Sequence, residues 1–190
     1  MKAVSATRTF CAPVVLLAVR GTNENPPKAT FTHGVGSRNW RTWEYLASQT
    51  GVKPSIDGRA ATAIDNAPVE YPATLDYSAS RNQGTRALTS TMKEVAKYCP
   101  ETKTVLVGYS QGADVVNSVL IAAPEGADQV IGLIAYADPH FDRDWAGLGI
   151  TWPQGAVYKH DGAFDARKAT FGAEQLTNNQ QWCLPKDPVC

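Results

Sequence analysis

The chain has 190 residues, 43% of them hydrophobic, and its 18 basic and 18 acidic side chains give a formal net charge of zero at pH 7. This length predicts a single domain, over residues 1–190, that can bury a core of its own. The balanced charge, without a cluster of Lys and Arg, argues against nucleic acid or an anionic membrane surface as the main partner. No apolar run is long enough to cross a bilayer as a helix.

The first expected element is a strand over residues 13–19. This run is continuously apolar, as in strands that are buried on both faces of a parallel sheet. Because Lys2 and Arg8 precede the run, it could also pass for the apolar part of a signal peptide. The nearby Cys11 and the polar motif that follows favour a strand, so we predict no secretory signal. Residues 20–27 then form a turn at the carboxyl end of this strand, where open α/β sheets bind ligands.

A helix is expected next, with Ser37 as its N-cap and Gly51 as its end. Its apolar residues recur at steps of three and four: Trp40, Trp43, Leu46 and Ala47. We interpret the two tryptophans as core residues rather than substrate contacts. Residues 52–66 predict a loop or an irregular strand, and a short second strand follows over residues 68–71.

The second half of the chain alternates between strand and helix patterns. A helix begins at residues 78–81 and carries an apolar face that ends at Cys99, on the buried side: Leu88, Met92, Val95 and Cys99. Residues 102–124 contain a strand, a sharp turn and a helix. Residues 130–137 and 180–183 predict two more strands, and residues 141–177 predict no regular element. This order favours a three-layer, doubly wound α/β fold with a mainly parallel sheet.

The sharp turn carries the most informative motif of the chain. Residues 108–112 read Gly-Tyr-Ser-Gln-Gly, the Gly-x-Ser-x-Gly pattern of a nucleophile elbow. A β-branched apolar run precedes it and helical spacing follows it, which is the context that this motif requires. The turn would expose the hydroxyl of Ser110, and the N–H of Gln111 would lie unpaired at the positive end of the helix. A chance match in a loop is the alternative, and the flanking elements favour the elbow.

The four cysteines, Cys11, Cys99, Cys183 and Cys190, allow three pairings into disulfides. Neither a Cys-x-x-Cys pair nor a Cys/His cluster with zinc spacing is present, so we expect no metal and no other cofactor. Disulfides are typical of exported proteins.

Four features together resemble the cutinase-like serine esterases of the α/β-hydrolase fold. One is Gly-Tyr-Ser-Gln-Gly-Ala at 108–113, and a second is Arg-Gly-Thr-Asn-Glu at 20–24, after the first strand. The third is Tyr-Pro-Ala at 71–73. The fourth is the cysteine frame, with Cys-Pro at 99–100 and a Cys-x-x-x-Asp-x-x-Cys ending at 183–190. These features span nearly the whole chain.

The resemblance implies a role for each of these positions. Ser110 would be the nucleophile, and the oxyanion donors would come from Gln111 and Thr22. Asp187, inside a small disulfide loop, would orient the catalytic histidine. A turn aspartate before a proline is the alternative reading of Asp187. The implied disulfides are Cys11–Cys99 and Cys183–Cys190.

The histidine itself departs from the family pattern. In the family it follows the last cysteine by about a dozen residues, whereas this sequence stops at Cys190. The histidines present are His33, His140 and His160, and none matches the family position. The first interpretation is that the segment with the histidine is missing from the sequence. The others are that His140 or His160 has become the base, or that the chain is a pseudoenzyme. We therefore expect this chain to hydrolyse activated esters slowly.

The function that the resemblance implies is hydrolysis of carboxylic esters through an acyl-enzyme on Ser110. Substrates could be cutin-like polyesters, acylglycerols or cell-envelope lipid esters, some of them insoluble. Mycolyl esterases of the phage lysin B type and acetylxylan-type esterases are alternatives within the family. A non-catalytic module that binds lipids or esters is an alternative of another class, and an unrelated function on the same fold is a third. The cysteine frame and the family also imply a secreted monomer.

Overall fold

The structure is a computed structural model that describes residues 11–24, 36–49, 64–141, 162–164, 179–184 and 187–190. Four helices, one of them a short 3₁₀ helix, and five strands lie within these ranges. In chain order they are β1 (Val14–Val19), α1 (Ser37–Gln49), β2 (Ile64–Pro68), α2 (Tyr77–Tyr98), β3 (Lys103–Tyr109), α3 (Gln111–Ala122), η1 (Ala127–Gln129), β4 (Val130–Tyr136) and β5 (Asn179–Trp182).

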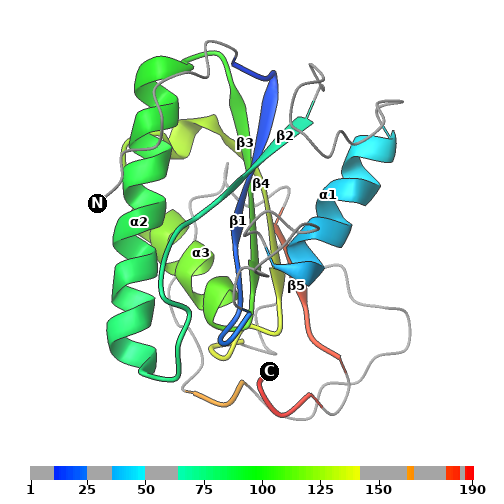
Figure 1. Cartoon of the computed structure of the whole chain (residues 1–190), viewed down its shortest axis with the longest axis vertical. Helices are drawn as coiled ribbons and strands as arrows, with labels where there is room; N and C mark the ends of the chain where they lie inside the picture. The colour runs from blue at the N-terminus through cyan, green and yellow to red at the C-terminus, as the bar shows by residue number, and fades with distance from the viewer. Residues whose placement is uncertain (1–10, 25–35, 50–63, 142–161, 165–178, 185–186) are drawn as a thin grey trace.

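The strands form one sheet in the order β2-β1-β3-β4-β5, and each neighbouring pair is parallel. Helices α2 and α3 cover one face of this sheet, and α1 covers the other (Figure 1). The three-layer, doubly wound α/β fold predicted from the sequence is therefore confirmed. The strand that leads into the elbow, β3, is the central one, so the elbow opens at the middle of the carboxyl edge of the sheet.

The core consists of two apolar layers, one on each face of the sheet. In β1, Leu17 and Val19 face α2 and α3, whereas Leu16 and Ala18 face α1. All four of these side chains are fully buried, which explains the uninterrupted apolar run in this strand. Trp43 is 2% exposed and packs in the α1 layer, so its assignment to the core is confirmed. Trp40 packs against the same layer and is partly buried.

The position of the second strand was predicted wrongly. The strand is β2, at Ile64–Pro68, rather than residues 68–71. β2 is an edge strand of half-buried residues in which Asp65 and Asn66 interrupt the apolar ones, so it lacks the apolar run that marks a central strand. Val69 and Tyr71 are buried, at 0% and 5% exposure, because the segment that leads into α2 crosses the core. The apolar pattern of residues 68–71 therefore reflects burial in the core rather than pairing in the sheet.

Other expectations agree with the structure to within a few residues or fall outside the described ranges. The helix expected from residues 78–81 begins at Tyr77, and Cys99 is its C-cap, half-buried rather than inside the helix. Gly51, the expected end of α1, lies outside the described residues, as does most of 141–177. No helix among the described residues is long and apolar enough to span a membrane.

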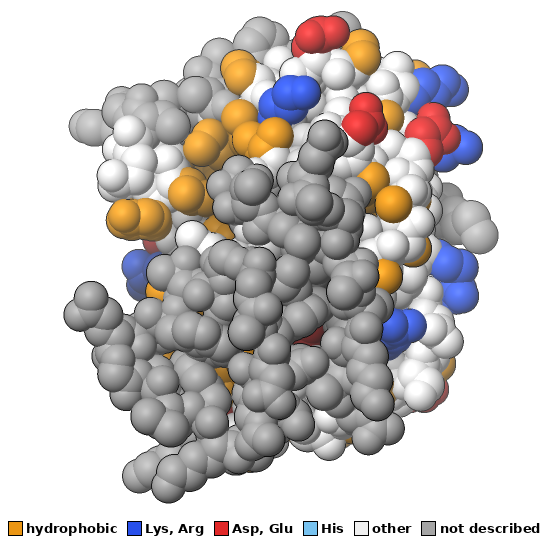
Figure 2. Space-filling view, turned by 180° about the vertical axis from the view of Figure 1, so that it is seen from behind, with side chains coloured by type: hydrophobic (Ala, Val, Ile, Leu, Met, Phe, Trp, Pro, Cys, Tyr) orange, Lys and Arg blue, Asp and Glu red, His pale blue; other side chains and the backbone are white. Residues whose placement is uncertain are grey.

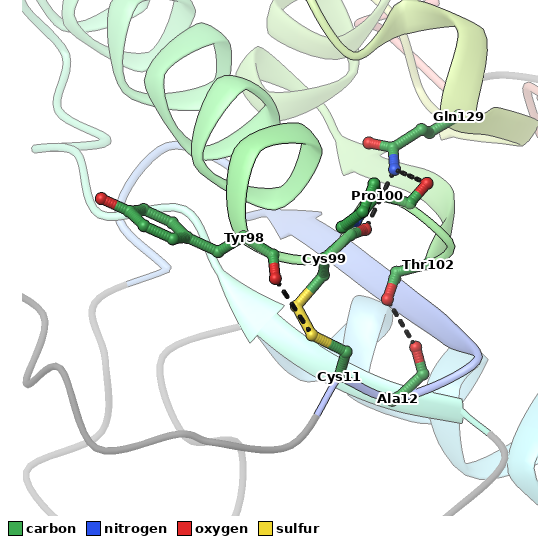
Figure 3. Close-up of a disulfide and its surroundings, with 7 residues drawn as sticks. All are labelled: Cys11, Ala12, Tyr98, Cys99, Pro100, Thr102 and Gln129. Atoms are coloured by element: carbon green, nitrogen blue, oxygen red, sulfur yellow. Dashed lines mark hydrogen bonds between the residues drawn. A yellow bond between two sulfur atoms is a disulfide. The ribbon is translucent and has the colours of Figure 1, made fainter.

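The cysteines pair as the resemblance implies. Cys11 is bonded to Cys99 across 88 residues, and Cys183 is bonded to Cys190 across 7. The first disulfide joins the residues before β1 to the end of α2 (Figure 3). Hydrogen bonds surround it: Thr102 Oγ1 donates to the Ala12 carbonyl at 2.7 Å, and Gln129 Nε2 donates to the Pro100 carbonyl at 2.8 Å. This disulfide therefore lies at the amino-terminal edge of the sheet, opposite the elbow.

Candidate active site

Ser110 lies between β3 and α3 in a strained backbone conformation. Its φ is 53° and its ψ is −118°, values that a residue with a side chain rarely adopts. The Ser110 N–H donates to the Tyr136 carbonyl of β4 at 2.8 Å, and its own carbonyl accepts the N–H of Ala113 at 2.8 Å. Both the strand before Ser110 and the helix after it are present. The serine thus has the strand–turn–helix setting in which a nucleophile elbow exposes its hydroxyl.

The two glycines of the motif allow the backbone segments to approach closely. A Cβ on Gly108 would lie 2.4 Å from the Gly112 carbonyl oxygen. A Cβ on Gly112 would lie 2.1 Å from the Val19 carbonyl oxygen, at the end of β1. These neighbours are backbone atoms, which cannot rotate away. Absence of a side chain at both positions therefore lets the first turn of α3 rest on β1 and β3.

Thr22 lies in a tight turn that follows β1, next to the elbow. Val19 pairs with Gly108 in the sheet, so the turn leaves the sheet at the same edge as Ser110. The Glu24 carboxylate fastens this turn: Oε2 accepts the Gly21 N–H at 2.8 Å, and Oε1 accepts the Ser37 hydroxyl at 3.1 Å. The sequence motif contains Glu24, but sequence reasoning gave it no role. The carboxylate links the Thr22 turn to the start of α1.

Gln111 is the first residue of α3, and its side chain is completely buried. The amide oxygen accepts the Ser80 hydroxyl at 2.8 Å, and the amide nitrogen donates to the Thr74 carbonyl at 3.1 Å. The side chain therefore points away from the open face of the elbow, into the layer beneath α2. Its backbone N–H lies in the first turn of α3, where helix donors lack an intrahelical partner.

Asp187 lies in the loop closed by Cys183 and Cys190. Its Oδ1 accepts the Val189 N–H at 2.9 Å, and its own N–H donates to the Leu184 carbonyl at 2.9 Å. The two cysteines are 3% and 1% exposed. They form an apolar cluster against which Tyr109, the neighbour of Ser110, packs. The structure thus brings the Asp187 loop and the elbow to the same edge of the sheet.

His140 is the one histidine among the described residues, since His33 and His160 lie outside them. Its backbone N–H donates to Asp138 Oδ1 at 2.9 Å. Its ring centroid is 5.2 Å from that of Phe164, and its Nε2 is 3.8 Å from Asp114 Oδ2. His140 therefore borders a polar junction between α2, α3 and the segment after β4.

Asp114 is the centre of that junction, and sequence reasoning missed it. It lies one helical turn after Ser110 and is 1% exposed. Its carboxylate accepts the Tyr77 hydroxyl at 3.0 Å and Arg81 Nε at 3.1 Å. Ser118 Oγ lies 3.1 Å from it as well. Tyr77 and Arg81 come from α2, so no spacing within α3 could have indicated these two partners.

Two tyrosines close to this site have strongly raised pKa values. Burial raises the pKa of Tyr71 well above its ordinary value of 10.0, and the charges of Glu24 and Asp114 add to this. Burial also raises the pKa of Tyr77, and the charge and hydrogen bond of Asp114 raise it further. Both hydroxyls donate in the folded chain, Tyr71 to the Arg20 carbonyl and Tyr77 to Asp114. Ionisation would break these bonds.

The stability of the fold is therefore expected to decrease in alkali. Tyr71 and Tyr77 stay protonated in the folded chain at a pH where the unfolded chain has begun to lose those protons. Their contribution is complete below pH 10 and is lost as the pH rises toward their raised pKa values, by about 1.4 kcal/mol per pH unit for each tyrosine. Urea unfolding between pH 8 and 11 measures this slope.

The tyrosine variants separate this effect from general alkaline damage. Tyr71→Phe and Tyr77→Phe are each expected to make the alkaline slope shallower, and Tyr45→Phe, on an exposed ring, controls for the substitution itself. Equal slopes in the parent chain and in both buried-tyrosine variants would contradict the prediction.

A groove of about 830 Å³ lies on the other face of the sheet, between α1 and strands β3, β4 and β5. Arg38, Tyr45 and Trp182 are among its lining residues. Its lining includes none of the site residues predicted from the sequence. On the face that Figure 2 shows, blue and red side chains of the described residues are mixed rather than gathered by sign. No cluster of metal-ligating side chains occurs among the described residues.

The family follows from a comparison with family models. The model described as Cutinase matches residues 10–190. The chain belongs to the cutinase family. This membership makes it a carboxylic ester hydrolase, as the sequence motifs predicted.

Individual known proteins are similar to this chain in sequence or in fold. Carboxylesterase Culp1 of Mycobacterium tuberculosis is 28% identical over 182 residues, which cover 95% of this chain and 69% of that protein. Cutinase 4 of Emericella nidulans is 34% identical over 130 residues, 68% of this chain and 50% of that protein. The catalytic core domain of acetyl xylan esterase from Trichoderma reesei has the same fold, with a TM-score of 0.70 and 24% identity, over 95% of this chain and 86% of that one.

Proposed function

We propose that this cutinase-family chain is a serine esterase that forms an acyl-enzyme on Ser110. The observation that carries the proposal is the strained elbow, which holds Ser110 at the positive end of α3 and at the centre of the carboxyl edge. The Ser110 hydroxyl attacks the ester carbonyl, and its proton passes to a histidine base. The histidine returns this proton to the leaving alcohol, and water, deprotonated by the same base, then attacks the acyl-enzyme and releases the acid and the free serine.

The negative charge that develops on the carbonyl oxygen needs fixed donors. The N–H of Gln111, at the first turn of α3, and the N–H of Thr22, in the turn after β1, are the proposed pair. Asp187 would hold the histidine in one tautomer. The disulfide-closed loop supports this role because it restrains the aspartate beside the elbow.

Apolar side chains support esters with an apolar part as the substrate class. Leu75 is 79% exposed and directly follows Thr74, the partner of Gln111. Leu184 is 62% exposed and belongs to the Asp187 loop. Exposed leucines on these two segments favour lipid or polyester substrates over small acetyl esters. The two disulfides support an extracellular site of action.

Labelling with a fluorophosphonate tests this function. The reagent is expected to modify Ser110 alone, located by peptide mass mapping, and the Ser110→Ala variant should remain unmodified. Ser118→Ala, which removes another hydroxyl from α3, is the matched control and should be labelled like the parent chain. Absence of labelling in the parent chain would contradict the proposal and favour a non-catalytic module that binds esters.

The same reagent tests whether His140 is the base. His140→Ala is expected to label at close to the parent rate, because the His140 Nε2 lies 3.8 Å from Asp114 Oδ2 in the polar junction. A loss of labelling by several orders of magnitude in His140→Ala would instead assign the base to His140.

A further inference from the structure

The two proposed oxyanion donors come from separate parts of the fold. Thr22 belongs to the turn after β1, and Gln111 begins α3 after β3. An oxyanion hole works only if its donors are held in place before the charge develops, because a shift of about 1 Å can cost on the order of 100-fold in rate. Other residues must therefore keep the backbone at Thr22 and the backbone at Gln111 in a fixed position relative to each other.

One short segment contacts both of them. The carbonyl of Ala73 accepts the N–H of Asn23, the residue next to Thr22, at 2.7 Å. The carbonyl of the following residue, Thr74, accepts the side-chain amide of Gln111 at 3.1 Å. Consecutive carbonyls of the connection between β2 and α2 thus hold the two halves of the proposed oxyanion hole. Ala73 has a φ of 53°, an unusual conformation for a residue with a side chain.

Ser80 completes the arrangement from the first turn of α2. Its hydroxyl donates to Gln111 Oε1 at 2.8 Å and accepts the Thr74 N–H at 3.1 Å. Ser80 is 1% exposed and Gln111 is 0% exposed, so water does not replace these bonds. Thr74, Ser80 and Gln111 form a closed ring in which each residue is bonded to the other two. The ring leaves the Gln111 side chain a single orientation.

We propose that Ser80 and the Gln111 side chain are positioning residues for ester hydrolysis. Through Ala73 and Thr74 they hold the N–H groups of Gln111 and Thr22 in one arrangement around the oxyanion. The inference rests on the proposed function of Ser110 and extends it to residues that do not touch the substrate. It differs from a purely structural role because it predicts a loss of turnover beyond any loss of stability.

Kinetics with p-nitrophenyl butyrate test the proposal. Ser80→Ala is expected to lower kcat by about 10- to 100-fold while KM changes by less than about twofold, since the ring acts on the transition state rather than on substrate binding. Ser80→Thr keeps a hydroxyl at this position and should restore most of the rate. Gln111→Met keeps the side-chain volume without the amide, and a loss similar to that of Ser80→Ala is expected. The double variant should be no worse than either single variant, because both act through the same ring.

Thr102→Val is the matched control. It removes a buried hydroxyl that donates to a backbone carbonyl, at the far edge of the sheet from Ser110. It should lower the stability to urea to a similar degree as Ser80→Ala but leave kcat within about twofold of the parent chain. Far-UV circular dichroism identifies any variant that does not fold, and Gln111→Met then serves in place of Ser80→Ala.

The two proposals fail in different ways. If a fluorophosphonate does not label Ser110 in the parent chain, the proposed function is wrong, and the positioning role is wrong with it. If Ser110 is labelled but folded Ser80→Ala and Gln111→Met keep the parent kcat, the positioning role alone is wrong. Strictly additive losses in the double variant would also overturn it.

Discussion

Replacing Cys11 and Cys99 together by alanine is expected to lower the free energy of unfolding by about 4–5 kcal/mol. The bond spans 88 residues, so its removal frees a large loop in the unfolded chain, and chain-entropy reasoning gives a loss of this size. The folded state is expected to keep its local contacts, such as the hydrogen bond of 2.7 Å that the Thr102 hydroxyl donates to the Ala12 carbonyl beside the disulfide (Figure 3). Such a loss is a large part of the total stability of a domain.

The paired replacement of Cys183 and Cys190 is the matched control. Its loop spans only 7 residues, for which the same reasoning gives about 2 kcal/mol. Urea unfolding of both variants measures the difference. A larger loss for the short loop than for the long one would contradict the entropic account of these bonds.

The order of the two disulfides is expected to be the opposite for function. Loss of the short-loop disulfide should affect labelling of Ser110 more than loss of the long-loop disulfide. The Cys11–Cys99 bond lies at the edge of the sheet opposite Ser110, so fluorophosphonate labelling should persist below the melting temperature of that variant. The Cys183–Cys190 bond closes the Asp187 loop, which packs beside the elbow through Tyr109. Its removal should therefore slow labelling although it costs less stability.

Gly112→Ala is expected to destabilise the fold by about 3 kcal/mol and to prevent formation of the elbow. The new Cβ would lie 2.1 Å from the carbonyl oxygen of Val19 and 2.7 Å from that of Arg20. Both obstacles are backbone atoms of the strand end and turn that lead to Thr22, so relief requires α3 to move away from β1. Overpacking of this kind costs about 1–3 kcal/mol or more. For a chain of this length the melting temperature should fall by roughly 6–12 °C.

Gly84→Ala, in the middle of α2, is the matched comparison. There a Cβ would meet the Tyr71 ring at 2.9 Å and a methyl group of Val115 at 3.0 Å, both of which belong to side chains. Side chains can shift, and alanine favours a helix by about 1 kcal/mol over glycine. We therefore expect a smaller change in stability and retained labelling of Ser110. Thermal unfolding followed by circular dichroism measures both variants, and equal losses would contradict the argument.

Much of the fold could be predicted because its signals are local. The apolar run in β1 and the strand–Gly-x-Ser-x-Gly–helix pattern each depend on residues within one short segment. The elbow in particular is a local backbone geometry, so its five residues, together with the strand and helix patterns that flank them, predict it without knowledge of the rest of the chain. The placement of Ser110 at the carboxyl edge then follows from the parallel sheet.

The sequence failed where tertiary contacts decided the outcome. Val69 and Tyr71 look like a strand because they are apolar, yet they lie in the core after β2. The residues that pair with β1 are 64–68, where Asp65 and Asn66 interrupt the apolar residues. An edge strand is set by its neighbour, β1, and needs no apolar pattern of its own. Burial and strand pairing produce the same apolar signal over a few residues, and only the sheet distinguishes them.

The sequence by itself determined the fold class, the elbow with Ser110, and the family resemblance with its cysteine frame. The tertiary structure decided which polar groups support the site. Glu24 fastens the Thr22 turn, and Ser80 meets Gln111 across 31 residues of sequence. A single buried hydrogen bond between distant residues produces neither a periodic pattern nor a bias in composition. The sequence of either segment therefore does not indicate it. It exists only because the packing of α2 against α3 brings the two groups together.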